Sequence, residues 1–205
     1  MIKNPFSGKF IAFEGLDGSG LSTQAELLSK VLNEKGVETI LTKEPTVDSE
    51  AGKKIKEVLT KKEKMKPDEF QNLFTTDRRE HLDKIIMPAL REGKWVVVDR
   101  YFFSSFAYGV SDDVSLDWLI RINDDFVLPD ITFILKTNPE LSMERIEKKG
   151  TKKTLYEKKE KLEKVWKTYE ILPERFPNCV VLDGEKPIEE IFIETKKIVS
   201  KKLLK

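Results

Sequence analysis

The chain has 205 residues, of which 39% are hydrophobic and 36% are charged, a composition typical of one globular domain with an ionic surface. Its 37 Lys and Arg residues nearly balance 36 Asp and Glu residues, and the formal net charge of +1 excludes a nucleic-acid binder that works through bulk positive charge. The single Cys179 excludes an internal disulfide, and the sequence has no apolar run long enough for a membrane helix. We therefore expect a cytoplasmic protein whose partners include neither a membrane nor a nucleic-acid polymer.

Short apolar runs alternate with longer amphipathic segments along the chain. Residues 9–15 form a strand candidate that leads into a glycine-rich turn, and residues 22–36 have the pattern of a helix. Further strands are expected at residues 37–45, 94–101, 130–137 and 179–184; helices are expected at residues 49–62 and 67–93, the second kinked near Pro88, and from Ser104, Leu116, Pro139, Thr154 and Pro187 onward. Strands separated by helices predict βαβ units, and hence one α/β domain over residues 1–205 with a parallel sheet.

The glycine-rich turn has most of a phosphate-binding loop. Gly15 and Gly20 have the required separation, Ser22 follows at the required position, and Leu21 stands where the loop normally has a lysine. Backbone N–H groups and the helix N-terminus can bind phosphate without that lysine, and the Ser22 hydroxyl can coordinate Mg²⁺. The alternative interpretation is a tight connection between a strand and a helix.

Polar residues follow two of the expected strands. Asp99 ends the strand at residues 94–101, where a carboxylate can hold a metal ion, and Arg100 follows with a guanidinium suited to a phosphate. A structural salt bridge between them is the alternative. The segment KEPT, residues 43–46, ends the strand at residues 37–45 and opens onto the same edge of the sheet.

Two further patterns suggest binding of a flat, charged molecule. Phe74 and Arg78 are four residues apart on one face of the long helix, an arrangement that can hold a nucleobase, although Phe74 can equally belong to the core. His81 on the same helix is interpreted as a polar residue that ties the helix to its neighbours. Residues 145–167 are densely charged, which is typical of a solvated helical hairpin.

In this order, these segments resemble the thymidylate kinase family from about Lys9 to the C-terminus. The resemblance is carried by FEGLDGSG, EPT, the long block at residues 73–109, residues 128–150, and the pair Tyr156–Glu157. It implies a P-loop nucleoside monophosphate kinase-like fold with a five-stranded parallel sheet flanked by helices and a small helical lid at about residues 145–157. It also implies an ATP:dTMP phosphotransferase that uses Mg²⁺ with ATP and forms a homodimer.

The resemblance assigns residues to four overlapping groups. The dTMP-binding residues are Asp17, Glu44, Pro45, Phe74, Arg78, Arg100, Ser104, Ser105, Tyr108 and Tyr156, with Phe74 stacked on thymine, Arg78 donating to its carbonyl and Tyr156 excluding a ribose 2′-hydroxyl. The ATP- and phosphate-binding residues are Gly15, Gly18, Ser19, Gly20, Leu21, Ser22, Thr23 and Arg145. The metal-binding residues are Ser22 and Asp99, and the catalytic residues are Asp17, Asp99, Arg100, Lys149, Lys152 and Lys153.

Several positions depart from the family pattern. Leu21 replaces the loop lysine, Lys43 stands where Arg is common, and Gly109 stands where a polar residue often contacts the base. The missing loop cation is expected to come from the lid, and the Leu21 side chain is expected to point into an apolar pocket beside the loop. Two alternatives remain open: a related kinase with another acceptor, and a pseudokinase that binds nucleotide without transferring phosphate.

Overall fold

The computed structural model describes residues 1–60, 62–148 and 155–203, except for the side chains of residues 155–158. Its main sheet has five strands, and each pair of neighbouring strands is parallel. In spatial order the strands are β3 (Thr39–Lys43), β4 (Trp95–Asp99), β2 (Phe10–Gly15), β6 (Ile131–Lys136) and β7 (Cys179–Asp183). The predicted α/β fold with a five-stranded parallel sheet is confirmed, and each expected strand lies within one or two residues of its observed ends.

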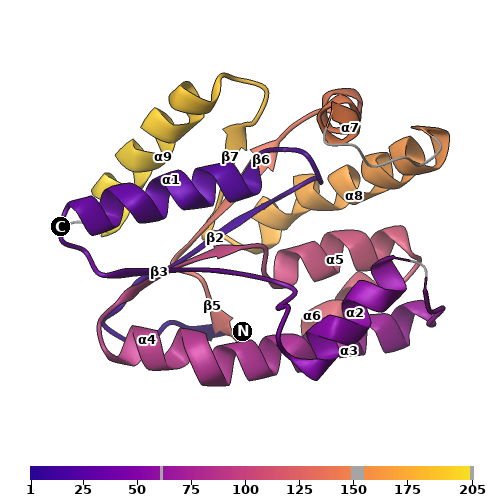
Figure 1. Ribbon diagram of the computed structural model, residues 1–205, viewed down its shortest axis with the longest axis horizontal. Helices are drawn as coiled ribbons and strands as arrows, with labels where there is room; N and C mark the ends of the chain where they lie inside the picture. The colour runs from indigo at the N-terminus through magenta and orange to yellow at the C-terminus, as the bar shows by residue number, and fades with distance from the viewer. Residues whose placement is uncertain (61, 149–154, 204–205) are drawn as a thin grey trace.

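The central strands β2 and β4 are mostly apolar because helices cover both faces of the sheet, and their charged residues, Glu14 and Asp99, lie at or near their carboxyl ends. Every residue of β2 and β4 is buried. Side chains alternate between the faces, so that Ile11 packs in one hydrophobic cluster while Phe10 and Ala12 pack in the other. Figure 1 shows the resulting three layers, with the sheet between two groups of helices.

The two helical layers have different compositions. One layer consists of α1 (Leu21–Glu34) and α9 (Ile188–Leu203), which contact each other over the sheet. The opposite layer contains α4 (Met87–Arg91), α5 (Phe102–Ser111) and α8 (Leu155–Arg175). The remaining helices are α2 (Glu50–Leu59), α3 (Pro67–His81), η1 (Leu82–Ile86), α6 (Leu116–Ile122) and α7 (Pro139–Lys148).

The long helix expected at residues 67–93 is formed by α3, η1 and α4 in direct succession. The expected irregularity near Pro88 is a π-helical turn at residues 82–86. Proline has no N–H to donate to the carbonyl of Lys84, and a wider turn before it accommodates the lost hydrogen bond. Other helix ends also shift slightly: α5 begins at Phe102, two residues before the expected start, and Thr154 lies outside the described residues.

A second, two-stranded parallel sheet was not predicted. It pairs β1 (Ile2–Lys3) with β5 (Val127–Leu128), and these strands are too short to give an alternating pattern in the sequence. Within the described ranges, no helix is both long enough and apolar enough to cross a bilayer.

The strand register determines which residues meet at the carboxyl edge of the sheet. Asp99 pairs with Phe13 on one side and with Lys43 on the other, while Gly15 pairs with Leu135. Polar residues that follow β2, β3 and β4 therefore come together at this edge, the usual position of ligand sites in open parallel sheets.

Candidate active site

The glycine-rich turn connects β2 directly to the N-terminus of α1. Gly15, Gly18 and Gly20 all have positive φ angles, which are easily adopted only by glycine. A side chain at Gly18 would also collide with α7, because a Cβ there would lie 2.5 Å from the backbone oxygen of Ser142. The turn thus brings the backbone N–H groups of α1 to the sheet edge, the arrangement that suits a phosphate.

Leu21 is the first residue of α1, and its side chain is buried. It is only 5% exposed and belongs to the hydrophobic cluster that also contains Phe13, Ala25 and Leu28. The predicted orientation into an apolar pocket is therefore confirmed. Ser19 is buried as well, and its hydroxyl oxygen has no hydrogen-bond partner among the described residues.

A hollow over the glycine-rich turn, which we call the loop hollow, is lined by residues 16–18 and 20–23 together with Lys43, Asp99 and Arg100. Three of its polar side chains contact one another. The Ser22 hydroxyl donates to Asp99 Oδ2 at 2.5 Å, and the Lys43 ammonium group donates to the same oxygen at 2.9 Å. The structure thus places side by side the two residues that the family resemblance assigns to the metal. Lys43 was not predicted as a site residue, although its position at the end of β3, paired with the end of β4, is the signal that could have identified it.

The chemistry of this pair fits a magnesium ion held through oxygen atoms. A carboxylate and a hydroxyl are hard oxygen ligands, and Mg²⁺ usually combines one or two such groups with water and phosphate oxygens. Within the described part of the chain no cluster of three or more His, Cys, Asp or Glu side chains is suited to hold a metal. A magnesium ion at Ser22 and Asp99 would therefore need oxygens from a nucleotide or from water.

Arg100 lies at the centre of the edge, directly after β4. Its φ angle is 71°, an unusual value for a residue with a side chain and one that often marks functional positions. Its guanidinium donates to the Gly15 carbonyl at 2.9 Å, to Ser104 Oγ at 3.0 Å and to Asp17 Oδ1 at 2.8 Å. The structure thus brings together Asp17, Arg100 and Ser104, three of the residues that the family resemblance assigns to the dTMP site.

Glu14 lies beneath Arg100, is fully buried, and was not predicted. Its carboxylate accepts hydrogen bonds from the Tyr101 backbone N–H at 2.8 Å, from Ser104 Oγ at 2.5 Å and from Tyr169 Oη at 3.1 Å. Burial raises the pKa of Glu14 from 4.5 to about 7, although these hydrogen bonds and the charge of Arg100 oppose the rise. A carboxylate inside an otherwise apolar strand was the available signal in the sequence.

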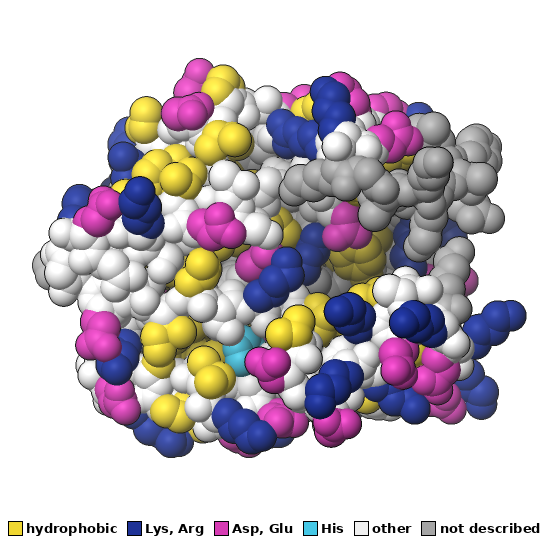
Figure 2. Space-filling model, in the orientation of Figure 1, with side chains coloured by type: hydrophobic (Ala, Val, Ile, Leu, Met, Phe, Trp, Pro, Cys, Tyr) yellow, Lys and Arg dark blue, Asp and Glu magenta, His cyan; other side chains and the backbone are white. Residues whose placement is uncertain are grey.

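Beside the loop hollow lies a cavity of about 270 Å³ between the sheet edge and helices α3 and α5. Figure 2 shows a hollow on this face of the molecule, with hydrophobic side chains inside it and charged side chains at its rim. Every predicted dTMP-binding residue with a described side chain lines the cavity: Asp17, Glu44, Pro45, Phe74, Arg78, Arg100, Ser104, Ser105 and Tyr108. Lys43, Leu59, Gln71 and Tyr101 also line it and are not among the predicted dTMP-binding residues.

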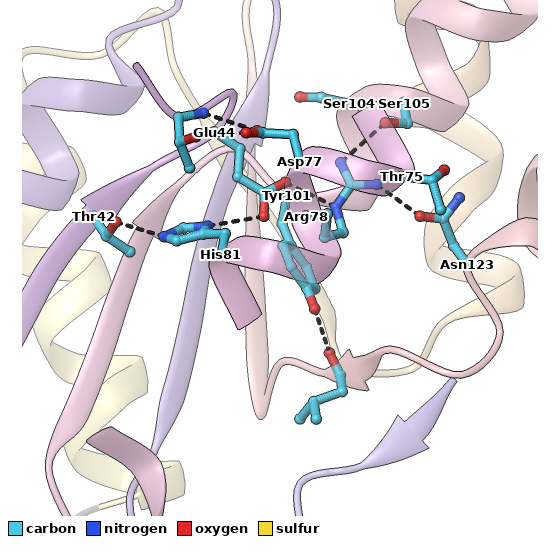
Figure 3. A network of polar contacts seen from close by, with 12 residues as sticks. Thr42, Glu44, Thr75, Asp77, Arg78, His81, Tyr101, Ser104, Ser105 and Asn123 are labelled. Atoms are coloured by element: carbon cyan, nitrogen blue, oxygen red, sulfur yellow. Dashed lines mark hydrogen bonds and ion pairs between the residues drawn. The ribbon is translucent and has the colours of Figure 1, made fainter. Parts of the chain in front are cut away.

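Arg78 is the centre of a buried polar network on one side of this cavity (Figure 3). Its guanidinium donates to Glu44 at 2.8 Å, to Asn123 at 2.7 Å and to Ser105 at 3.0 Å, so three of its five N–H groups are used within the protein. His81 Nδ1 lies 3.1 Å from Glu44 and its Nε2 lies 2.7 Å from Thr42 Oγ1, which confirms that His81 ties the helix to β3.

Phe74 is half-buried, and its ring packs against Phe70 with the ring centroids 4.9 Å apart. The side chain lines the cavity and does not belong to either hydrophobic core cluster. Of the two alternatives weighed from the sequence, the position beside the cavity is therefore the observed one.

The predicted lid residues lie mostly outside the described part of the chain. This applies to Lys149, Lys152 and Lys153 and to the side chain of Tyr156. Arg145 is described: it lies on α7, the helix that packs against Gly18, and donates to the Gly184 carbonyl at 3.1 Å. Thr23, in the first turn of α1, lines the loop hollow together with Gly18, Gly20 and Ser22.

Comparison with known proteins gives a consistent result over nearly the whole chain. A family model described as thymidylate kinase matches residues 13–194. A probable thymidylate kinase of Pyrococcus horikoshii is 40% identical over 202 residues, which cover 96% of this chain and 98% of the relative. A probable thymidylate kinase of Archaeoglobus fulgidus is 38% identical over 190 residues, which cover 92% of this chain and 93% of the relative. A thymidylate kinase of Caldicellulosiruptor saccharolyticus is 35% identical over 204 residues, which cover 97% of this chain and 98% of the relative.

The match includes the phosphate-loop helix, the Asp99–Arg100 pair and the helix that carries Phe74 and Arg78, which are the elements that build the two adjoining hollows. The chain belongs to the thymidylate kinase family.

Proposed function

We propose that the protein transfers the γ-phosphate of ATP to dTMP, giving ADP and dTDP. One observation carries the proposal: the loop hollow and the larger cavity share Asp17, Lys43 and Arg100 in their walls. A triphosphate on the glycine-rich loop and a monophosphate in the cavity would therefore meet at the same charged residues. That arrangement suits phosphoryl transfer, which depends mainly on positioning and charge stabilisation.

In the proposed complex, dTMP occupies the larger cavity. Its base stacks on Phe74 and accepts from an N–H group of Arg78 that the buried network leaves unused. Its phosphate binds Arg100, whose guanidinium is already oriented by the Gly15 carbonyl and Asp17. The sugar and base lie beside Ser104, Ser105 and Tyr108. The cavity wall that follows β3 is formed by Glu44 and Pro45.

ATP occupies the loop hollow, with its phosphates on the backbone N–H groups of residues 18–23. An ionised oxygen of the dTMP phosphate attacks the γ-phosphorus, the bond between that phosphorus and the bridging oxygen breaks, and ADP leaves with the bond's electron pair. No protein nucleophile and no general base is required, because the attacking oxygen is already charged near neutral pH. Arg100 and Asp17 hold the acceptor in line for this displacement.

Ser22 and Asp99 are the residues that would hold Mg²⁺. When bound with ATP, the ion neutralises charge on the β- and γ-phosphates. Lys43 donates to the same Asp99 oxygen that accepts from Ser22. Because the Lys43 side chain is 59% exposed, its ammonium group can turn toward the phosphates when they bind. We include Lys43 in the charge-stabilising set for this reason.

The loop itself contributes no side-chain cation, because Leu21 is turned into the core. The remaining cations are proposed to be Arg145 on α7 and the lid lysines Lys149, Lys152 and Lys153. Replacing the three lysines by Ala should then abolish turnover, and adding Leu21→Lys to that variant should restore part of it. Full activity of the triple variant would contradict the role of the lid.

The proposal includes an assembly and a location. As the family resemblance implies, we propose a homodimer, and we place the enzyme in the cytoplasm, where both nucleotides are available. Sedimentation of the purified chain at several concentrations tests the first statement, since a single species with the 23.8 kDa mass of one chain would contradict it.

A coupled assay of ADP release over a panel of nucleoside monophosphates tests the acceptor. The proposal predicts the highest kcat/KM for dTMP, a lower value for dUMP, and little turnover with dCMP or purine monophosphates. Preference for another monophosphate would identify a kinase with a different acceptor. Binding of dTMP by calorimetry without any ADP release would identify a pseudokinase.

A further inference from the structure

Gln71 lies on the wall of the larger cavity and has no role in the buried network around it. It occupies α3 one turn before Phe74 and two turns before Arg78, a spacing of three and seven residues that places all three on one helix face. All three side chains line the cavity. Gln71 is only 3% exposed, so it is a buried polar group beside the space proposed for the base.

The side-chain amide of Gln71 carries an unsatisfied acceptor. Its oxygen is fully buried and unpaired among the described residues, whereas most buried polar atoms in proteins are satisfied. The neighbouring polar residues do not compensate for this, because Arg78 directs its bonded N–H groups to Glu44, Asn123 and Ser105. The terminal torsion of glutamine is soft, so the amide can rotate to meet a ligand in the cavity.

The facing helix makes room for this amide. Gly109 on α5 has no side chain, and a Cβ at that position would lie 3.2 Å from Gln71 Cδ and 2.8 Å from Leu119 Cδ1. Any side chain at position 109 would therefore have to displace Gln71 or Leu119. Gly109 itself offers no side-chain group to a ligand, whereas the Gln71 amide beside it does.

We propose that Gln71 is a specificity-determining residue that accepts a hydrogen bond from the N3–H group of thymine or uracil. This inference rests on the proposed function, since it concerns the base of the acceptor. Arg78 can only donate, so its unused N–H groups match a carbonyl oxygen of the base. The adjacent ring nitrogen of thymine donates, and the unpaired Gln71 oxygen is the complementary acceptor.

The same pair of residues disfavours cytosine. Cytosine carries an amino group beside an accepting ring nitrogen, the reverse of the thymine pattern. Gln71 alone could adapt by rotating its amide, but Arg78 would then face an amino group, donor against donor. The rigid donor thus fixes the orientation of the base, and the adaptable amide completes the recognition of its edge.

The test uses Gln71→Leu, which has a similar volume without the amide, and Asn72→Leu as a matched control on the exposed side of the same helix. Calorimetry measures dTMP, dUMP and N3-methyl-dTMP, which lacks the N3–H group. In the natural protein, N3-methyl-dTMP should bind at least about tenfold more weakly than dTMP, as expected for one lost hydrogen bond at a buried site. Gln71→Leu should weaken dTMP and dUMP by similar factors and reduce the discrimination against the methylated base.

Steady-state kinetics separate recognition from a general structural effect. Gln71→Leu should raise the KM for dTMP and leave kcat at saturation nearly unchanged, because the amide lies on the base side of the cavity and the reaction occurs at the phosphate. Asn72→Leu should change neither. If Gln71→Leu does not fold, the comparison of dTMP with N3-methyl-dTMP on the natural protein still tests whether the cavity recognises the N3–H group of the base.

The failures of the two proposals are distinguishable. If the natural protein does not bind dTMP at all, the proposed function fails. If it binds and phosphorylates dTMP but binds the N3-methyl analogue equally well, or if Gln71→Leu binds dTMP as tightly as the natural protein does, the role of Gln71 is wrong and the proposed function stands.

Discussion

Replacing Glu14 by Gln should flatten the pH dependence of stability. In the folded protein burial raises the pKa of Glu14 from 4.5 to about 7, whereas in the unfolded chain the group returns to its ordinary value. Between these values the folded protein binds a proton that the unfolded chain has released. The stabilisation is therefore fully present below pH 4.5 and is lost as the pH rises through about 7.

The size of this effect follows from the shift. Each pKa unit corresponds to about 1.4 kcal/mol, so the rise from 4.5 to about 7 amounts to roughly 3 kcal/mol of unfolding free energy. Glu14→Gln removes the titration but keeps an acceptor for the Tyr101 N–H. We therefore expect the natural protein to lose about 3 kcal/mol more than the variant between pH 4.5 and pH 8.

Urea unfolding at several pH values measures this difference directly. Glu26→Gln on the exposed side of α1 is the matched control and should follow the natural protein. Other titrating groups are common to all three proteins, so they cancel when the profiles are subtracted. Parallel profiles for the natural protein and Glu14→Gln would show that Glu14 titrates near its ordinary pKa and would refute the reasoning.

Four further substitutions test individual residues of the site. Phe74→Ala should raise the Kd of dTMP by about tenfold or more, since stacking of a base on an aromatic ring contributes about 1–3 kcal/mol; unchanged calorimetry would remove Phe74 from the base site. Arg100→Ala should weaken dTMP far more than thymidine, and an equal loss for both ligands would make Arg100 structural. Tyr156→Ala should reduce discrimination against ribonucleotides in a competition assay, and constant selectivity would contradict the steric role. Lys43→Ala should lower kcat/KM by at least about tenfold, or about 1.4 kcal/mol of barrier, whereas an exposed control such as Lys30→Ala should not; equal values for both would show that Lys43 only pairs with Asp99.

The sequence was sufficient for the fold because its pattern is regular. Buried runs such as residues 95–99, separated by amphipathic segments, leave little choice but a parallel sheet covered on both faces. Helix boundaries were less certain, since the π-helical turn before Pro88 depends on how one missing N–H is accommodated by its neighbours. The short pair β1 and β5 depends on contacts between residues that lie far apart in the sequence.

The site was predictable where residues follow a strand or share a helix face. Asp99, Arg100 and Phe74 were found in this way, and the strand register brings the first two to the loop. Lys43, Glu14 and Gln71 were not assigned roles, because their positions depend on tertiary packing. The unpaired amide of Gln71, for example, becomes apparent only when the absence of a side chain at Gly109 is seen across the cavity.

The most direct test of the account is turnover by the natural chain, with Leu21 in place, when it is given Mg²⁺-ATP and dTMP. ADP release is measured together with direct detection of dTDP, for the natural protein and for Leu21→Lys. The account predicts dTDP formation by the natural protein that requires both dTMP and Mg²⁺, because loop N–H groups, Lys43, Arg100 and the lid supply the charge stabilisation. If the natural protein binds dTMP but forms no dTDP, and Leu21→Lys alone turns it over, the loop lysine is indispensable and the central claim is wrong.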